Sequence, residues 1–151
     1  SLTKMFGLPG IRAGFAVGTG DLGDRLRTAR PTWSLSVPAA AVGTHCLRAT
    51  AFVERTRERV AAERARMRSA LSDEYDVAPS DAPFFLVDVG DDPVDDPGGA
   101  TDPVDRVLER ARDRGVAVRD ARTFAGLDSH IRVAVRRPHG NDLLLDALRD
   151  R

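Results

Sequence analysis

The sequence predicts a mixed fold that combines α/β and α+β parts, and two kinds of pattern predict it. Apolar residues recur at helical spacing along residues 51–72, whereas the runs 84–89 and 130–136 are short and apolar, as strands are. Helical and strand patterns also alternate along the chain instead of forming separate blocks. With 151 residues, of which 42% are hydrophobic, the chain is long enough to bury one ordinary core.

The first fifty residues are expected to contain a loop, a brief strand and two helices. Glycine and proline interrupt residues 1–20, and apolar residues near 11–17 favour a short extended segment. Asp21 is a suitable cap for a helix that ends before Pro31, because proline disfavours helical backbone at the preceding residue. The alanine-rich helix expected over residues 37–50 has almost no polar face, so we expect it to be buried.

The most regular element is the helix over residues 51–72. Its apolar residues fall on one face, and most of its other positions are arginine or glutamate at salt-bridge spacing. The run FFLVDV at residues 84–89 predicts a strand. Residues 91–105 are rich in aspartate, proline and glycine, which predicts an exposed loop, and they lack the spacing of a calcium loop.

The last third of the chain predicts two helices and two strands. A helix over residues 103–114 is expected to end at the following glycine. Strands are expected at residues 116–119 and 130–136. A closing helix is expected to follow Asn141 or Asp142 and to run through about Leu148.

Charge is distributed unevenly, although the net charge is zero. Residues 1–70 carry twelve basic and five acidic residues, residues 71–105 carry eleven acids and no base, and residues 106–151 carry eleven arginines and seven acids. Of the 23 basic residues only Lys4 is a lysine. Any lysine chemistry in this chain must therefore involve Lys4.

Several classes of protein are not expected. No apolar run approaches the roughly 20 residues of a membrane span, and no basic segment precedes an apolar one as in a signal peptide. The single cysteine, Cys46, excludes an internal disulfide, and the three histidines lack metal spacing, so we expect no metal site. Glutamates among the arginines of residues 55–68 cancel much of their charge, and no aromatic residue lies between them. Both observations argue against nucleic-acid binding. A cytoplasmic protein that binds neither membrane nor nucleic acid fits best.

The loop around Lys4 brings together residue types suited to an aldehyde cofactor that carries a phosphate. A lysine amine can form a Schiff base with pyridoxal phosphate. The hydroxyls of Ser1 and Thr3 can donate to phosphate oxygens, and Arg12 can add a bidentate, permanently charged contact. A surface lysine in a glycine-rich loop is the alternative for such a residue near a terminus.

Arg119 and Arg132 form a second candidate pair. They stand thirteen residues apart, each in or at the end of an apolar strand. Burying an arginine on such a strand is costly unless an anion meets it. The alternative is an ordinary strand arginine whose guanidinium reaches solvent.

The segment SLTKMFGLPGIRAGF resembles the cofactor-lysine motif of the class I/II aminotransferases, the fold-type I pyridoxal-phosphate enzymes. The resemblance implies that Lys4 is the Schiff-base lysine and that Ser1, Thr3 and Arg12 bind the cofactor phosphate. The eight-residue step from Lys4 to Arg12 is the one that the motif has. Because the chain begins inside this motif, we expect it to be a fragment, inactive by itself.

The second half resembles the end of the small domain in the same family. By this resemblance Arg132 binds the substrate α-carboxylate and Arg119 binds a distal phosphate. The run FAGLDSHIRVAVR looks like the threonine-phosphate decarboxylases, which make the aminopropanol linker of cobalamin. Histidinol-phosphate aminotransferases share the lysine loop and both arginines, so an aminotransferase remains the first alternative. A non-catalytic remnant that acts as an interaction domain is the second alternative.

The resemblance also implies an organisation. Residues 1–50 would end the large cofactor-binding domain, residues 51–72 would form a connecting helix, and residues 73–151 would form the small α+β domain. The expected enzyme is a homodimer that decarboxylates L-threonine O-phosphate with pyridoxal 5'-phosphate. Its expected partner is a small phosphorylated amino acid.

Overall fold

The computed structural model describes residues 2–90 and 102–149, and the chain divides into two compact units. Unit 1 is Ser1–Arg57 and unit 2 is Glu58–Arg151. The boundary falls within the long helix α4 (Thr50–Leu71), whose first turns belong to unit 1 and whose remainder belongs to unit 2.

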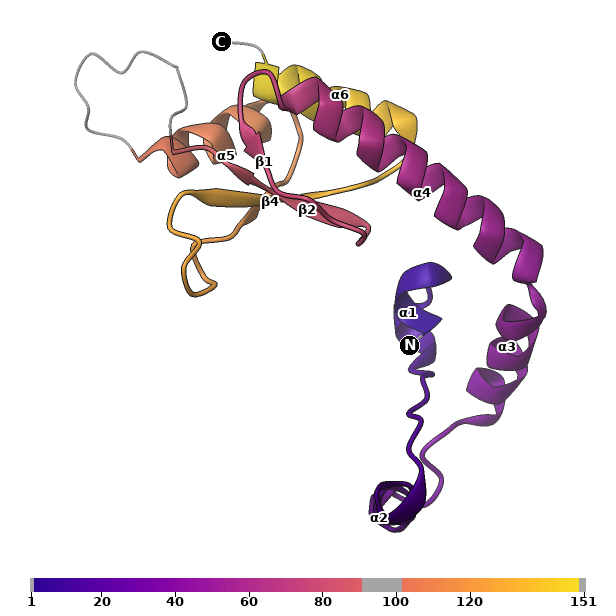
Figure 1. The fold of residues 1–151 in the computed structure, drawn as a ribbon. Helices are drawn as coiled ribbons and strands as arrows, with labels where there is room; N and C mark the ends of the chain where they lie inside the picture. Colours follow the sequence, from indigo (N-terminus) through magenta and orange to yellow (C-terminus); the bar gives the residue numbers. More distant parts are fainter. Residues whose placement is uncertain (1, 91–101, 150–151) are drawn as a thin grey trace. The chain divides into compact units, whose positions relative to one another are not determined.

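Unit 1 is helical where it is regular (Figure 1). Its elements are α1 (Leu2–Met5), the 3-10 turn η1 (Pro9–Ile11), α2 (Gly20–Ala29), α3 (Val37–Arg48) and the start of α4. Its core is small, and four buried apolar residues form it: Leu2, Ala13, Ala39 and Cys46. Phe6 stacks on Phe52 of α4, with 5.7 Å between the ring centroids, and extends this small core.

The strand predicted near residues 11–17 is wrong. Residues 12–19 have no regular secondary structure, and the side chains of Phe15 and Val17 are 70% and 83% exposed. A strand persists only where a neighbouring strand satisfies its backbone groups, and no described segment of unit 1 pairs with these residues. Residues 11–17 therefore have the apolar pattern of a strand but no described neighbouring strand with which to pair.

The boundaries of the two helices that follow agree closely with the sequence. Helix α2 ends at Ala29, and Arg30 is extended ahead of Pro31, as predicted. The cap position is Thr19, however, and Asp21 lies inside the first turn, where a negative charge still favours the helix N-terminus. Helix α3 begins after Ser36, whose hydroxyl accepts a hydrogen bond from the Ala39 amide at 3.2 Å.

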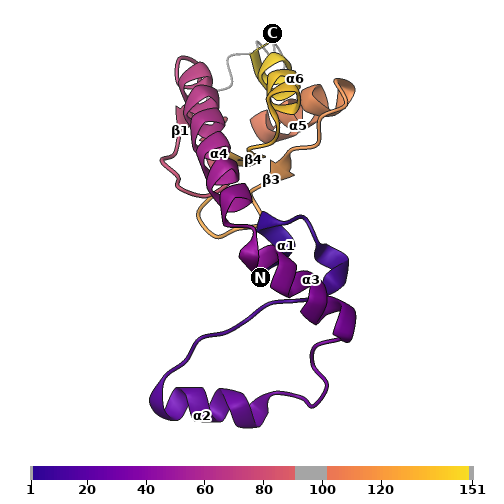
Figure 2. The same cartoon turned by 90° about the vertical axis from the view of Figure 1, so that its right-hand side faces the viewer.

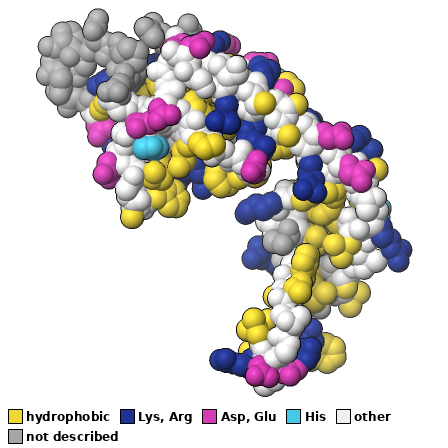
Figure 3. All heavy atoms as spheres, viewed as in Figure 1, with side chains coloured by type: hydrophobic (Ala, Val, Ile, Leu, Met, Phe, Trp, Pro, Cys, Tyr) yellow, Lys and Arg dark blue, Asp and Glu magenta, His cyan; other side chains and the backbone are white. Residues whose placement is uncertain are grey.

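The expected burial of α3 is wrong for most of its surface. Ala39, Gly43 and Cys46 are buried, but Val37 is 84% exposed and Leu47 is 62% exposed. Helix α3 therefore packs along one narrow stripe and leaves the rest of its apolar surface open. Hydrophobic side chains are correspondingly visible at the surface of unit 1 in Figure 3.

Unit 2 is built on a four-stranded antiparallel sheet in the order β1-β2-β4-β3. Its strands are β1 (Asp76–Val77), β2 (Phe84–Asp88), β3 (Arg119–Asp120) and β4 (His130–Ala134), and its helices besides α4 are α5 (Pro103–Asp113) and α6 (Pro138–Arg149). The central pair is β2 with β4, in a register that places Leu86 opposite Arg132. The strands predicted at residues 84–89 and 130–136 are confirmed.

The helices of unit 2 cover one face of this sheet (Figures 1 and 2). Alternate strand residues such as Val87, Ile131 and Val133 are buried against them, together with Met67 and Leu71 of α4. The residues between them in sequence point to the opposite face, because successive side chains of a strand alternate. The sheet therefore has one face covered by helices and one open face, and Arg132 lies on the open one.

Three features of unit 2 differ from the sequence prediction. The two-residue strand β1 was not predicted, and only Arg119 of the segment 116–119 is in a strand. Helix α6 begins at Pro138, so Asn141 lies within it and is fully buried. The side-chain nitrogen of Asn141 donates hydrogen bonds to the Glu63 carboxylate at 2.6 Å and to the Arg136 carbonyl. The side-chain oxygen of Asn141 accepts a hydrogen bond from the Arg136 backbone amide. Asn141 is therefore not a helix cap: its buried side chain connects α6 to Glu63 of α4 and to the backbone of Arg136.

Helix α5 matches its predicted end. Gly115 follows its last residues with φ +74°, a left-handed conformation that favours glycine. The Asp102 carboxylate caps the other end by accepting from the Val104 amide at 2.8 Å. The greater part of the acidic loop predicted at residues 91–105 lies outside the described residues.

Candidate functional site

The predicted lysine loop is a closed turn in unit 1. Lys4 is exposed on α1, and Thr3 beside it is half-buried. The Leu2 amide donates to the Ala13 carbonyl at 3.2 Å, and both side chains enter the small core. Thr3 follows Leu2 and Arg12 precedes Ala13, so this hydrogen bond brings the backbone beside Thr3 close to the backbone beside Arg12. Ser1 lies outside the described residues.

Arg12 has a strained backbone conformation. Its φ is 53°, in the left-handed region that costs a non-glycine residue about 1 kcal/mol or more. Its Nη1 donates to the Pro9 carbonyl at 3.1 Å, and its side chain is exposed. Arg12 also lines a hollow of about 580 Å³, with Arg27, Arg30 and Ser34 among the other lining residues. Three arginines, Arg12 among them, therefore stand around a hollow whose other lining is mostly apolar.

The side chains on this turn fit a cofactor with an aldehyde and a phosphate. Lys4 supplies an exposed primary amine, Thr3 a hydroxyl and Arg12 a guanidinium, all within one turn closed by a hydrogen bond. An amine is the group that condenses with an aldehyde, and a hydroxyl with a guanidinium is a donor set for phosphate. The donor chemistry thus agrees with pyridoxal phosphate.

The structure brings Arg119 and Arg132 together in unit 2. They are direct partners in the antiparallel register of β3 and β4. Directly opposed residues share one face, with Cβ atoms about 4.5–5.5 Å apart. Two like charges placed in this way repel each other. A bound anion would remove that cost, so the pair has the arrangement of an anion site.

Aromatic rings, not carboxylates, support the two guanidinium groups. The Arg132 guanidinium lies 5.1 Å from the centroid of the Phe84 ring, and it forms no hydrogen bond or ion pair with any residue in the described ranges. The Arg119 guanidinium lies 5.9 Å from the Phe124 ring, and its Nη2 donates to the Thr123 hydroxyl at 3.3 Å. Cation–π contacts orient a charge without neutralising it. Both arginines therefore keep their positive charge available.

A small hollow of about 110 Å³ lies at this pair. Its lining includes Arg119, Arg132 and Arg136. No acidic residue is among its lining residues in the described part of the chain. Three cations around one hollow favour an anionic ligand.

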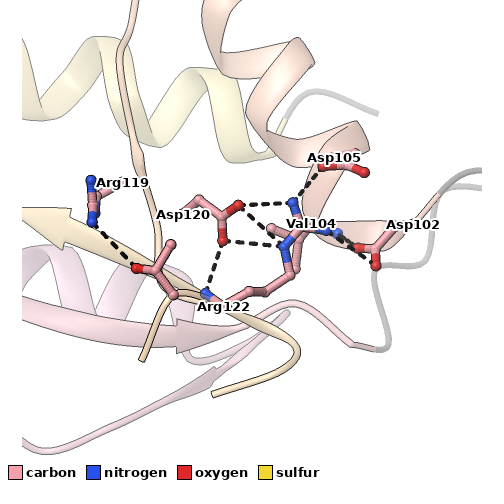
Figure 4. A network of polar contacts seen from close by, with 7 residues as sticks. Asp102, Val104, Asp105, Arg119, Asp120 and Arg122 are labelled. Atoms are coloured by element: carbon pink, nitrogen blue, oxygen red, sulfur yellow. Dashed lines mark hydrogen bonds and ion pairs between the residues drawn. The ribbon is translucent and has the colours of Figure 1, made fainter. Parts of the chain in front are cut away.

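Next to Arg119, a carboxylate network holds Arg122 (Figure 4). Arg122 forms a bidentate contact with Asp120, including Nη2 to Oδ2 at 2.8 Å, and its Nη2 lies 2.5 Å from Asp105. Its Nη1 lies 3.2 Å from Asp102. The hydrogen bonds from Arg122 hold the pKa of Asp120 below its usual value, and the carboxylates of Asp120 and Asp105 raise the pKa of Arg122. The network joins the end of β3 to the first turn of α5.

A further polar group lies on the open sheet face. His130 is the register partner of Asp88, with 4.0 Å between His130 Nε2 and the Asp88 carboxylate. Burial raises the pKa of Asp88, but hydrogen bonds from the Ser129 hydroxyl and the Gly90 amide outweigh it, so the net shift is downward. Because it is two residues before Arg132 in β4, His130 shares the face of the arginine pair.

Sequence reasoning missed several neighbours of the pair, namely Phe84, Thr123, Phe124 and Arg122. Phe84 was noticed only as part of a strand, and nothing in its local pattern shows which side chain its ring will meet. Cys46 is buried in the small core of unit 1. Trp33 is 97% exposed and takes no part in the core of unit 1. None of the helices in residues 2–90 and 102–149 combines the length and the apolar composition that a membrane crossing requires.

Comparison with known proteins identifies the family. The family model for aminotransferase class I and II matches residues 1–150. Histidinol-phosphate aminotransferase 2 of Archaeoglobus fulgidus is 31% identical over 99% of this chain and 41% of its own length. A protein assigned as a threonine-phosphate decarboxylase in Caldanaerobacter subterraneus subsp. tengcongensis is 34% identical over 99% of this chain and 39% of its own length.

A solved structure supports the same conclusion. The crystal structure of L-threonine-O-3-phosphate decarboxylase from Porphyromonas gingivalis matches 98% of this chain and 44% of its own, with a TM-score of 0.76 and 25% identity. This chain thus spans about two fifths of the length of the curated relatives that it matches. Its fold is that of a part of such enzymes, and the chain belongs to the class I and II aminotransferase family.

Proposed function

We propose that the protein containing this chain uses pyridoxal phosphate to decarboxylate L-threonine O-phosphate. The observation that carries this proposal is the pair Arg119 and Arg132, opposed on one sheet face with their charges left unneutralised by described residues. A substrate with two anionic groups gives both arginines a partner. L-Threonine O-phosphate has a carboxylate at one end and a phosphate at the other.

The turn around Lys4 is the proposed cofactor site. Pyridoxal phosphate, when bound, supplies an aldehyde that lysine can bind covalently and a ring that accepts electrons from the bond being broken. Lys4 is the proposed covalent anchor because it supplies the exposed amine of this turn. Thr3, Arg12 and Ser1 are the proposed phosphate ligands, with Arg12 contributing the permanent charge.

Arg119 and Arg132 are the proposed substrate ligands. Arg132 would bind the α-carboxylate through its planar fork, with Phe84 fixing the guanidinium plane. Arg119 would bind the phosphate end. In the reaction the Cα–carboxylate bond breaks, carbon dioxide leaves, and a proton is added at Cα. By holding both ends of the substrate, the pair would fix the orientation that decides which bond at Cα breaks.

A histidinol-phosphate aminotransferase is the second candidate. The observation that favours it is the similar identity of the two relatives, 31% for an aminotransferase and 34% for the protein assigned as a decarboxylase. Its substrate also carries a phosphate and an amine, and the keto acid that receives the amino group supplies a carboxylate, so the same lysine and arginines would serve. The two reactions differ in their need for a keto acid.

The wider setting is part of the same proposal. Residues 1–50 would complete the larger cofactor-binding domain, residues 51–72 would connect it, and residues 73–151 would form the small domain. The enzyme would be a cytoplasmic homodimer that supplies the aminopropanol phosphate of cobalamin.

The test uses the whole protein that the gene encodes. It is given pyridoxal phosphate and L-threonine O-phosphate without a keto acid, and carbon dioxide and aminopropanol phosphate are measured. Release of both in equal amounts is the expected result. No release, together with amino transfer from histidinol phosphate once a keto acid is added, would instead establish the second candidate.

A further inference from the structure

We propose that Arg122 is a positioning residue for Arg119, acting through the turn that connects β3 to β4. The inference rests on the proposed function in one respect, that Arg119 binds an anionic group of the substrate. It assigns to Arg122 a task separate from binding: Arg122 fixes the segment whose side chains orient the Arg119 guanidinium.

The chain runs from Arg122 directly into two residues that interact with Arg119. The Thr123 hydroxyl accepts a hydrogen bond from the Arg119 guanidinium, and the Phe124 ring makes a cation–π contact with it. The turn begins at Ala121, which is fully buried and whose amide donates to the His130 carbonyl at 3.1 Å. Thr123 and Phe124 are themselves exposed. Their positions therefore depend on how well residues 121 and 122 are held.

Three carboxylates surround the Arg122 guanidinium: Asp120 on β3, Asp102 at the N-cap of α5 and Asp105 in the first turn of α5. The Arg122 amide also donates to the Asp120 carboxylate at 2.8 Å, which closes a tight turn at the end of β3. Arg122 thus ties the turn to its own strand and to a separate helix that packs in the core of unit 2.

The charges around Arg119 and Arg122 differ. The two arginines lie close in sequence, but among the described residues only Arg122 is surrounded by carboxylates (Figure 4). Bidentate contacts to Asp120 and the short contact to Asp105 commit those carboxylates to Arg122. They are thereby kept from competing with an external anion for Arg119. Loss of Arg122 would release the turn and leave these carboxylates without their cation, and both effects weaken anion binding at Arg119.

The experiment measures inorganic phosphate binding to the whole protein saturated with pyridoxal phosphate, by phosphorus NMR line broadening. Wild type is compared with Arg119→Gln, Arg122→Gln, Arg122→Lys and Asp105→Asn. Loss of supporting partners around metal ligands costs roughly 10–100-fold in affinity. For Arg122→Gln we expect the phosphate dissociation constant to rise by about five- to tenfold, with smaller increases for Asp105→Asn and Arg122→Lys.

The matched control is Arg66→Gln. Arg66 also bridges two carboxylates in unit 2, Glu63 and Asp142, each at 2.8 Å, and it has no contact with the β3–β4 turn. It should lose similar thermal stability while leaving phosphate affinity unchanged. The affinity for pyridoxal phosphate, followed by absorbance, should be equal in all variants. This second affinity controls for unfolding, because a partly unfolded variant would bind both phosphate and pyridoxal phosphate more weakly.

The outcomes separate the two proposals. If Arg119→Gln weakens phosphate binding but Arg122→Gln behaves like Arg66→Gln, the positioning role is overturned and the anion site stands. If Arg119→Gln leaves phosphate binding unchanged, Arg119 is not an anion ligand, and the positioning role falls with that part of the proposed function.

Discussion

The two units carry different parts of the candidate site, and their hydrophobic cores differ greatly in size. Unit 2 encloses a core of fourteen buried residues drawn from α4, α5, α6 and all but one strand of its sheet. Unit 1 has four buried residues in its core and leaves large apolar side chains exposed, including Phe15, Val37 and Leu47. The lysine loop lies in unit 1 and the arginine pair in unit 2.

The difference shows what each half of the chemistry requires. The arginine pair needs only a strand register, which unit 2 provides through its own core. The lysine turn closes through one backbone hydrogen bond and a few small residues, and its surroundings bury little apolar surface. Since about 25 cal/mol is gained per Å² of apolar surface buried, unit 1 has little to offset its chain entropy.

The largest expected effect is on independent folding. Residues 58–151 expressed alone should unfold in a single cooperative transition, whereas residues 1–57 alone should lack one, because only unit 2 has a sizeable core. Urea denaturation followed by circular dichroism checks this for both pieces. A cooperative transition in residues 1–57 would contradict the comparison.

Within unit 1, loss of the lysine amine should remove the chemistry. In the whole protein, Lys4→Ala should lower turnover by about a thousandfold or more, since the covalent anchor for the cofactor is gone. Steady-state rates with L-threonine O-phosphate provide the measurement. Arg25→Ala, an exposed α2 substitution, is the control and should leave the rate near that of wild type. Near-normal turnover of the Lys4 variant would eliminate Lys4 as the anchor.

The same truncation made in each unit should give unequal losses of stability. Leu71 in α4 is 0% exposed and Leu47 in α3 is 62% exposed. Leu71→Ala should lower the free energy of unfolding by about 2–5 kcal/mol, and Leu47→Ala by no more than about 0.5 kcal/mol. Urea titrations of the whole protein provide both values. Equal losses would mean that Leu47 is covered as well as Leu71.

A smaller effect is expected where unit 2 binds its last helix. The Tyr75 hydroxyl donates to the Leu148 carbonyl at 3.0 Å and accepts from Arg110 Nη2 at 3.1 Å. Tyr75→Phe keeps the buried ring but removes these bonds, and should cost about 1–2 kcal/mol. The variant is compared with wild type by urea denaturation. An unchanged midpoint would show that water replaces both bonds without loss.

The smallest effect is a dependence of stability on pH. Because Arg122 lowers the pKa of Asp120 in the folded protein, Asp120 stabilises the fold above its unfolded pKa of about 3.9, and this stabilisation is lost as the pH falls through the lower folded value. Residues 58–151 should therefore lose stability between about pH 5 and pH 2. Asp120→Asn and Arg122→Gln should both flatten that loss, measured by urea denaturation at each pH. An unchanged slope in both variants would refute the assignment.

The sequence predicts elements well where a pattern and its partner lie in the same unit. The strands at residues 84–89 and 130–136 and the unit 2 part of the helix over residues 51–72 are found because their apolar faces meet in one core. The strand near residues 11–17 is absent because no described segment pairs with it. Asn141 resembled a helix cap, since local pattern does not reveal that its amide will reach Glu63, 78 residues away.

The candidate site divides in the same way. Sequence spacing and resemblance single out Lys4, Thr3, Arg12, Arg119 and Arg132. The direct opposition of the two arginines depends on the register of β3 and β4, which spacing alone does not specify. The aromatic supports Phe84 and Phe124 and the link through Arg122 arise from tertiary contacts. They are visible only in the folded chain.

The most direct test of the central claim is to locate the cofactor on the protein. The whole protein is incubated with pyridoxal phosphate, reduced with borohydride, digested, and analysed by mass spectrometry. The account predicts that the reduced cofactor is found on Lys4, and that an excess of substrate before reduction diminishes the labelling. Labelling of another lysine with Lys4 unmodified would contradict it.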